Sequence, residues 1–223
     1  VKINGNSKSI KEKFVTWSDW SNLLISNFEG WFYIPTKPEY DYRYYIEQAR
    51  VGVRGIYKDT VGASNEYGDY QFRPNLLVAM TVAPDLFDPY HAVRCLDVVE
   101  SNLVGHIGMR TLDPSDWNYH PDYQNDLDND DKYTAKGFNY HNGPEWLWLT
   151  GYFFRASMRF RRPFTNKMKK LMSNLKRAFK ESPAFGLPEL TNKDGAFCAG
   201  SCLTQAWSVS SVLDMLYDYS QFT

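Results

Sequence analysis

Apolar residues recur every three to four positions in six stretches of the chain, and polar segments separate these stretches. Such spacing puts the apolar side chains on one face of a helix and therefore predicts amphipathic helices. The predicted helices span approximately residues 17–31, 75–82, 88–103, 144–162, 165–180 and 202–219. No stretch alternates apolar and polar residues convincingly enough to predict a strand. The pattern predicts an all-α fold of paired helices, with long loops that converge at one end.

Two of the predicted helices begin with capping signals. Thr16 is followed three positions later by Asp19, which is the pattern of an N-cap with an acidic first turn. Asp88 stands directly before Pro89, and an acidic N-cap followed by proline favours a helix start. We therefore expect these two helices to begin near residues 17 and 89.

The segment between the first predicted helix and residue 54 differs from the rest of the chain. It contains Pro35, Pro38 and a run of tyrosines and charged residues, which is typical of an exposed connecting segment. We therefore expect residues 1–53 to be a linker-like N-terminal segment with one helix. Residues 54–223 then form the main helical unit.

Size and charge limit the classes of function. The chain has 223 residues and a mass of 26.0 kDa, which suits one domain or a large piece of one. A formal net charge of -1 gives no electrostatic attraction to nucleic acid or to an anionic membrane. No apolar run is long enough to span a bilayer, and the N-terminus lacks the pattern of a signal peptide. We therefore expect neither a nucleic-acid partner nor a membrane partner.

The three cysteines, Cys95, Cys198 and Cys202, are an odd number without the spacing of a disulfide framework. This usage suits a reducing compartment, and we expect a cytoplasmic protein. Cys198 and Cys202 would need two further ligands to hold a metal ion, so ordinary thiols are the simpler interpretation.

Residues 137–148 combine a turn rich in glycine and proline with aromatic, basic and acidic side chains. Their Trp and Tyr rings can stack on a sugar ring, and Asn139, His141 and Glu145 can bond its hydroxyl groups. Aromatic residues make up 17% of the chain, which favours either a protein that binds a flat ligand or one with many packed helix–helix contacts. An aromatic helix start packed in a core explains the segment equally well. A carbohydrate pocket and a packed helix start both stay open at this point.

Two other segments carry candidate chemistry. Residues 186–192 present Glu189 between a proline and apolar residues, and such surroundings can raise a carboxyl pKa or orient the group as a general base. The alternative is an ordinary exposed glutamate. Residues 69–75 lead into a predicted helix, whose free backbone N–H groups can hold a ligand. The alternative there is a surface ion pair between Arg73 and Asp69.

Residues 110–131 are rich in aspartate, so a calcium loop has to be considered. Asp126, Asp128 and Asp130 fit the alternating ligand positions of such a loop. The glycine of its turn and its closing glutamate are both replaced by other residues. We therefore expect a solvated acidic loop or a hydroxyl-binding rim, and no metal site.

Taken in order, several segments of the chain resemble the C-terminal part of eukaryotic glycogen debranching enzyme. The resemblance runs from about residue 54 to the end, whereas the first fifty residues match only loosely. It rests on the ordered set and its compatible spacing rather than on any single segment. The segments are 69–75 (DYQFRPN), 108–114 (GMRTLDP), 127–130 (LDND), 137–148 (GFNYHNGPEWLW), 186–192 (GLPELTN) and 205–208 (QAWS).

The resemblance implies a six-hairpin (α/α) barrel, of which residues 54–223 would be the C-terminal portion. It also implies amylo-alpha-1,6-glucosidase activity, which removes α-1,6-linked glucosyl branch residues from glycogen limit dextrin. In the family this hydrolysis is inverting: one carboxylic acid protonates the leaving oxygen and one carboxylate activates water. The implied partners are glycogen or limit dextrin and the remainder of a bifunctional debranching enzyme with its glucanotransferase domain, and no cofactor is expected.

Under this resemblance, Glu189 falls at the position of the family's general base. The family's general acid is an Asp in a Trp-Met-Asp-like segment, which this chain lacks. The acid would then lie upstream of Val1, and the chain alone would be inactive. Motif position and side-chain chemistry together assign the glucosyl pocket to Tyr70, Gln71, Arg73, Asn75, Tyr140, His141, Trp146, Trp148, Gln205 and Trp207.

Two other functions stay open. In the first, the chain belongs to another (α/α)-barrel glycosidase and holds both carboxylates, with Glu145 or Asp69 as the acid. The two carboxyl groups should then lie about 6.5–9.5 Å apart and face one pocket. In the second, the chain is a helical module that binds glucan without catalysis.

Overall fold

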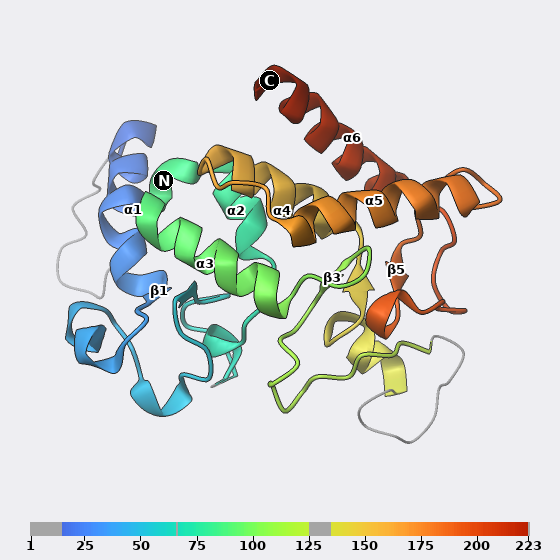
Figure 1. Ribbon diagram of the computed structural model, residues 1–223. Helices are drawn as coiled ribbons and strands as arrows, with labels where there is room; N and C mark the ends of the chain where they lie inside the picture. The colour runs from blue at the N-terminus through green and yellow to red at the C-terminus, as the bar shows by residue number, and fades with distance from the viewer. Residues whose placement is uncertain (1–14, 66, 125–134, 223) are drawn as a thin grey trace.

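The computed structural model describes residues 15–65, 67–124 and 135–222. Asp126, Asp128 and Asp130, which were considered as a calcium loop, lie outside the described residues. The helices fill the upper part of the view in Figure 1, and most of the short strands and long loops lie below them. The expected mostly helical class is confirmed. The six-hairpin barrel stays a prediction.

Six α-helices carry the described part of the fold, with short 3-10 helices between them. The α-helices are α1 (Trp17–Phe32), α2 (Leu76–Val82), α3 (Pro89–Asn102), α4 (Trp148–Arg159), α5 (Asn166–Glu181) and α6 (Ala206–Phe222). The 3-10 helices are η1 (Pro38–Arg43), η2 (Gln48–Arg50), η3 (Gly68–Tyr70), η4 (Pro84–Leu86), η5 (Ala135–His141) and η6 (Lys193–Gly195). The expected positions of α1, α2, α3 and α5 are confirmed, whereas α4 and α6 begin a few residues later than expected.

The predicted caps form as expected. The Thr16 hydroxyl accepts a hydrogen bond from the Asp19 backbone N–H, and the Asp19 carboxylate accepts one from the Thr16 N–H. This reciprocal pair satisfies two backbone donors that the first turn of α1 leaves open. The Asp88 carboxylate likewise accepts from the backbone N–H groups of Tyr90 and His91 at the start of α3.

Two small antiparallel sheets join the loops. They consist of β1 (Tyr33–Ile34) with β2 (Ile56–Tyr57), and of β3 (Met109–Arg110), β4 (Glu145–Trp146) and β5 (Leu190–Thr191) in the order β3-β4-β5. A strand of two residues cannot show alternation, so the sequence pattern contained no sign of these strands.

The first sheet corrects the interpretation of residues 33–54 as an exposed connecting segment. Tyr33 and Ile34 are buried, and they pair with Tyr57 and Ile56. The start of this segment is therefore part of the core, and the pairing joins the two sides of the expected boundary at residues 53 and 54. The division into two domains stays a prediction.

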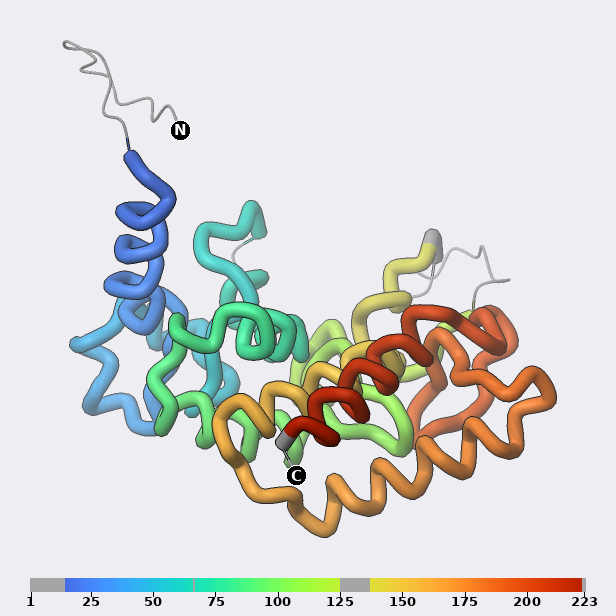
Figure 2. The backbone as a smooth tube through the Cα atoms, turned by 90° about the horizontal axis from the view of Figure 1, so that it is seen from above, coloured from blue at the N-terminus to red at the C-terminus, as the bar shows by residue number. Residues whose placement is uncertain are grey.

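Helix α4 lies at the centre of the helical layer and packs against both α2 and α6. Figure 2 shows α6 beside α4, with α5 along the outer edge. A Cβ on Gly151 of α4 would lie 2.2 Å from the carbonyl oxygen of Ser211 on α6, so only glycine permits this close crossing. Phe153 and Phe154 of α4 are fully buried in the core.

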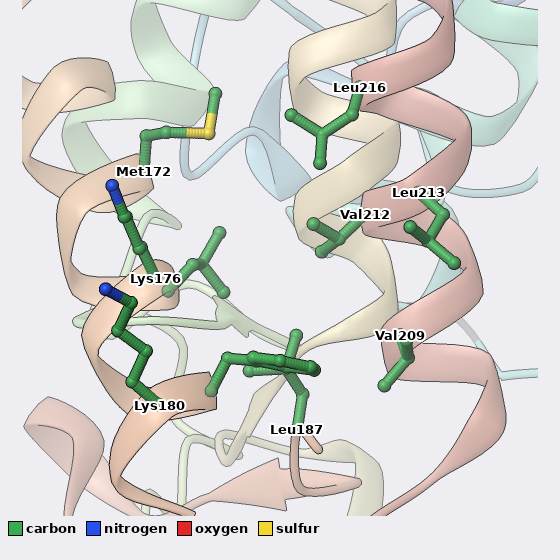
Figure 3. Close-up of a pocket in the computed structure, with 10 residues that line it drawn as sticks. Met172, Lys176, Lys180, Leu187, Val209, Val212, Leu213 and Leu216 are labelled. Atoms are coloured by element: carbon green, nitrogen blue, oxygen red, sulfur yellow. The ribbon is translucent and has the colours of Figure 1, made fainter. Parts of the chain in front are cut away.

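Apolar side chains remain accessible on α1 and between α5 and α6. Helix α1 has no buried residue, and Trp17, Leu23 and Ile25 on it are exposed. Figure 3 shows the groove between α5 and α6, with Leu187 at its base and Lys176 and Lys180 at its side. Among the described residues, no helix is both long enough and apolar enough to cross a membrane.

Candidate active site

A cavity of about 240 Å³ lies where the N-terminal ends of α2, α4 and α6 meet. Arg73 and Asn75 precede α2, Trp148 is the first residue of α4, and Trp207 lies in the first turn of α6. The lining consists of Arg73, Asn75, Thr111, His141, Trp146, Trp148, Leu149 and Trp207. The fold thus brings six of the ten predicted pocket residues to one cavity, although they come from segments far apart in the chain.

The walls of the cavity present flat aromatic rings. Trp148 and Trp207 stack with their ring centroids 4.3 Å apart, and Trp207 remains 49% exposed. His141 stacks on Trp146 at 5.2 Å, and Tyr140 meets Trp146 edge-to-face at 4.8 Å. The Trp146 indole N–H donates to the carbonyl oxygen of Tyr140, which fixes the ring. Partly exposed rings beside polar groups are suited to a ligand that has both apolar faces and hydroxyl groups.

Arg73 holds two walls of the cavity together. Its guanidinium donates to the carbonyl oxygens of His141 (2.6 Å) and Thr111 (3.1 Å). It also donates to the side-chain oxygens of Asn142 (2.7 Å) and Gln71 (2.9 Å). The expected alternative, a surface ion pair with Asp69, is therefore wrong. Burial lowers the pKa of Arg73 from its usual value.

The carboxylate of Glu189 lies next to this cavity and is held by three donors. The Tyr140 hydroxyl donates to Glu189 Oε1 at 2.5 Å, and Gln205 Nε2 donates to the same oxygen at 3.2 Å. The backbone N–H of Cys202 reaches Oε2 at the longer distance of 3.4 Å. Among the described contacts, Oε1 is thus the well-occupied oxygen, and Oε2 retains more capacity to accept a proton.

Tyr140 connects Glu189 with the wall of the cavity. Its ring lies 4.6 Å from that of His141 and 4.8 Å from that of Trp146, and both of these residues line the cavity. Burial, and then the hydrogen bond to Glu189, raise the pKa of Tyr140, so its hydroxyl stays protonated and remains a donor. Burial, and then the positive charge of Arg73, lower the pKa of His141 and favour its neutral form.

The backbone of Glu189 is fixed on both sides. Its N–H donates to the carbonyl oxygen of Cys202 at 2.9 Å, and its carbonyl oxygen accepts from Leu147 N–H at 3.2 Å. The next residue, Leu190, begins β5 and pairs with Trp146 of β4. Glu189 is therefore half-buried, and its backbone is hydrogen-bonded on both sides directly before a strand.

Glu145, one of the two alternative acids, lies away from these groups. It is 0% exposed, and its carboxylate accepts from the backbone N–H groups of His106 (3.0 Å) and Asp194 (3.1 Å). Arg110 Nε lies 3.9 Å from Glu145 Oε1. Burial raises the pKa of Glu145. This carboxylate fastens loops to the sheet.

Asp69, the other alternative acid, is also occupied by local contacts. Its carboxylate accepts from the backbone N–H groups of Gly62 and Ala63 and from the Thr60 hydroxyl, each at 2.8 Å. Burial opposes ionisation, but these bonds outweigh it and hold the pKa of Asp69 below its usual value. An ionised carboxylate that closes a loop is a poor proton donor.

Two of the predicted pocket residues have other positions. Tyr70 is buried, and its hydroxyl accepts from the Glu47 backbone N–H at 2.7 Å, so it braces a neighbouring segment. Gln71 is buried behind Arg73, and its amide N–H reaches Asp116 Oδ1 at 3.4 Å.

Sequence reasoning missed two polar residues at or next to the cavity. Asp59 accepts from the Asn75 side chain at 2.9 Å, and burial raises its pKa. Thr111 lines the cavity, and its hydroxyl accepts from Gly143 N–H at 2.9 Å. Their segments are irregular, and partners so far apart in sequence leave no local pattern.

The cysteines are free, with Cys95 and Cys198 buried and Cys202 exposed. Cys198 Sγ donates to the Tyr123 carbonyl oxygen. Within the described ranges, no group of three or more metal-ligating side chains gathers.

Comparisons with known proteins agree with these features. The chain is 46% identical over 222 residues to the glycogen debranching enzyme of Saccharomyces cerevisiae. The match covers 92% of this chain but only 14% of that protein, so the chain spans a small part of its relative. The model of a protein family described as amylo-alpha-1,6-glucosidase matches residues 2–214. The chain therefore belongs to the amylo-alpha-1,6-glucosidase family.

Proposed function

We propose that the chain forms one side of a glucosidase site that hydrolyses α-1,6-linked glucosyl branch residues of glycogen limit dextrin. The observation that carries this proposal is the carboxylate of Glu189, which Tyr140 and Gln205 hold next to an aromatic cavity. The name of the yeast relative, glycogen debranching enzyme, supports the substrate class.

In this mechanism Glu189 is the general base of an inverting hydrolysis. Its Oε2, which has only the long contact from Cys202, takes a proton from the attacking water. Oε1 stays fixed by Tyr140 and Gln205, so the carboxylate does not have to reorient when it accepts the proton.

The cavity would bind the terminal glucosyl ring. Its volume of about 240 Å³ lies below the range of about 300–1,000 Å³ that is typical for drug-sized ligands, so it suits a single sugar. Trp148, Trp207 and Trp146 supply flat faces for the ring. Asn75 and His141 supply side chains that bond hydroxyl groups.

The general acid of this mechanism belongs to a part of the parent enzyme outside residues 1–223. Neither Glu145 nor Asp69 suits that role, since each is occupied by its own donors. The proposal includes a six-hairpin (α/α) barrel, since α2, α4 and α6 direct their N-terminal ends to one cavity. The remainder of a cytoplasmic debranching enzyme, with its glucanotransferase domain, would complete that barrel, and the inverting reaction needs no cofactor.

Replacing Glu189 in the debranching enzyme that contains this chain tests the proposal. Glu189→Gln keeps the shape of the side chain but removes the base, so glucose release from limit dextrin should fall by about 100- to 10,000-fold. Glucan binding should persist, because the cavity walls are unchanged. Glu181→Gln at the exposed end of α5 is the matched control. Release that survives in Glu189→Gln would remove Glu189 from the role.

The second candidate is a glucan-binding helical module without catalysis. The positions of Glu145 and Asp69 favour it for the chain by itself, since neither provides a second carboxylate at the cavity. Titration of the isolated chain with maltooligosaccharide, combined with a glucose-release assay, distinguishes the candidates. Release by the chain alone would show that both catalytic groups are present in it.

A further inference from the structure

Tyr67 and Trp117 form an exposed aromatic pair on two different loops. Their rings meet edge-to-face, with centroids 5.1 Å apart and an angle of 81° between the planes. Tyr67 is 42% exposed and Trp117 is 65% exposed, so the contact contributes little to the core. An edge-to-face pair leaves flat ring faces that the partner ring does not cover. Such faces, held in contact with water, are suited to a ligand with an apolar face.

The local backbone holds Trp117 in place. The Asp116 N–H donates to the Asp113 carbonyl oxygen, and the Tyr119 N–H donates to that of Asp116, each at 3.0 Å. Asp116 Oδ1 also accepts from Asn118 N–H at 2.8 Å. Trp117 therefore projects from a hydrogen-bonded turn. Binding would immobilise little additional backbone, which lowers its entropic cost.

Tyr67 is anchored in a similar way. The N–H of Tyr70 donates to the Tyr67 carbonyl oxygen at 3.1 Å, where η3 begins. The Tyr70 hydroxyl is itself fixed by the backbone N–H of Glu47. The pair is thus a preformed surface built from two anchored turns.

Side-chain hydrogen bonds connect this pair with the proposed glucosyl cavity. Asp116, the neighbour of Trp117, accepts from the Gln71 amide, and the Gln71 carbonyl oxygen accepts from the Arg73 guanidinium. Arg73 lines the cavity. Two side chains, Gln71 and Asp116, therefore connect the cavity wall to the turn that carries Trp117.

We propose that Tyr67 and Trp117 bind the α-1,4-linked glucan chain that carries the branch. This inference rests on the proposed function, because it assigns the part of the substrate that the cavity cannot hold. A cavity of about 240 Å³ suits one sugar, whereas a branched glucan continues beyond it. The two rings of Tyr67 and Trp117, here called the platform, add affinity for a long substrate. They leave the binding of the terminal glucosyl residue unchanged.

Isothermal titration of the chain with a long and a short probe tests this assignment. The long probe is maltoheptaose with one α-1,6-linked glucosyl residue, and the short probe is isomaltose. Trp117→Ala should weaken binding of the long probe by about five- to tenfold and of isomaltose by less than about twofold. Trp117→Phe, which keeps a flat ring, should restore most of the loss. Trp17→Ala, at an 81% exposed tryptophan of α1, is the matched control and should change neither affinity.

The outcomes distinguish the assignment of the platform from the assignment of the glucosyl cavity. Equal losses for both probes in Trp117→Ala, or no loss for the long probe, would overturn the platform. If Trp207→Ala still weakens isomaltose in that case, the cavity assignment stands without the platform. If the unmodified chain binds neither probe, the proposed function fails and the platform fails with it. Circular dichroism of each variant confirms that a changed affinity does not come from unfolding.

Discussion

Glu145 lies on β4 and Glu189 lies directly before the neighbouring strand β5, yet their surroundings differ. Glu145 of β4 is fully buried, and its carboxylate accepts from the backbone N–H groups of His106 and Asp194. Glu189, directly before β5, is half-buried and is held mainly by the side chains of Tyr140 and Gln205. The first carboxylate faces loops, and the second lies next to the aromatic cavity.

This contrast shows that burial alone does not identify a catalytic carboxylate. Burial raises the pKa of Glu145, a property that is common at functional sites. Its oxygens, however, are occupied by backbone donors that cannot leave without opening the loops. Side-chain donors such as Tyr140 can orient a carboxylate without enclosing it. The identity of the donors therefore separates a structural carboxylate from a candidate base.

Removing each carboxylate in turn should give the largest difference. Glu145→Ala leaves two backbone N–H groups and the buried Arg110 Nε without this acceptor, so the free energy of unfolding should fall by about 3–5 kcal/mol. Glu189→Ala should lower it by less than about 1 kcal/mol, because its surroundings are half-exposed. Urea denaturation of both variants measures the two values. Similar losses would show that Glu189 is as structural as Glu145.

A smaller effect should come from crowding the Glu145 carboxylate. A Cβ on Gly105 would lie 2.1 Å from Glu145 Cδ, and the backbone donors prevent the carboxylate from moving aside. Gly105→Ala should therefore lower the free energy of unfolding by about 1–3 kcal/mol. Gly52→Ala is the matched control, because a Cβ there meets nothing within 4 Å. In a Glu145→Ala background the cost of Gly105→Ala should shrink, and purely additive losses would argue against this contact.

The orientation of Glu189 by Tyr140 predicts a still smaller, kinetic effect. Tyr140→Phe keeps the ring against Trp146 but removes the donor to Glu189 Oε1, so glucose release by the debranching enzyme should slow by about tenfold. Glucan binding should be unchanged, because the phenylalanine ring still packs on Trp146. Tyr217→Phe, on an exposed tyrosine of α6, is the control. An unchanged rate of glucose release in Tyr140→Phe would show that this hydrogen bond does not orient Glu189 for catalysis.

The helices were largely predictable because local signals define them. Thr16 and Asp88 cap α1 and α3 as their sequence neighbours indicate. The start of α4 was mispredicted, because Glu145 and Trp146 form a strand of only two residues before it. Such a short strand is defined by its pairing with β3 and β5. Partners that are distant in sequence leave no periodic pattern.

The candidate site was predictable in part, through side-chain type and ordered motifs. These gave Glu189 and Trp207 as candidates but could not give the bridge from Arg73 to the His141 carbonyl, which depends on how three helix ends meet. Tyr70 shows the opposite case. It shares a motif with Arg73, but the 3-10 turn at its position directs it to Glu47.

Asp59 is a third carboxyl group. Like Glu145 it has a pKa that burial raises, and like Glu189 it lies next to the cavity. Burial raises its pKa above the ordinary value of 3.8, and its side-chain partner is Asn75 of the cavity. In the pH range between 3.8 and the raised value, the folded chain holds a proton that the unfolded chain has released. The free energy of unfolding therefore falls as pH rises through this range and stays lower above it.

Asp59→Asn should remove this decline, because an amide does not ionise and can still accept from Asn75. We expect the variant to be slightly more stable than the unmodified chain at pH 7, by less than the roughly 1 kcal/mol typical of point substitutions. Below pH 3.8 the difference should vanish, since Asp59 is then protonated in both states. Urea denaturation at several pH values measures it. A variant that is less stable at pH 7 than the unmodified chain would contradict this, because it would show that the fold stabilises the charged form of Asp59.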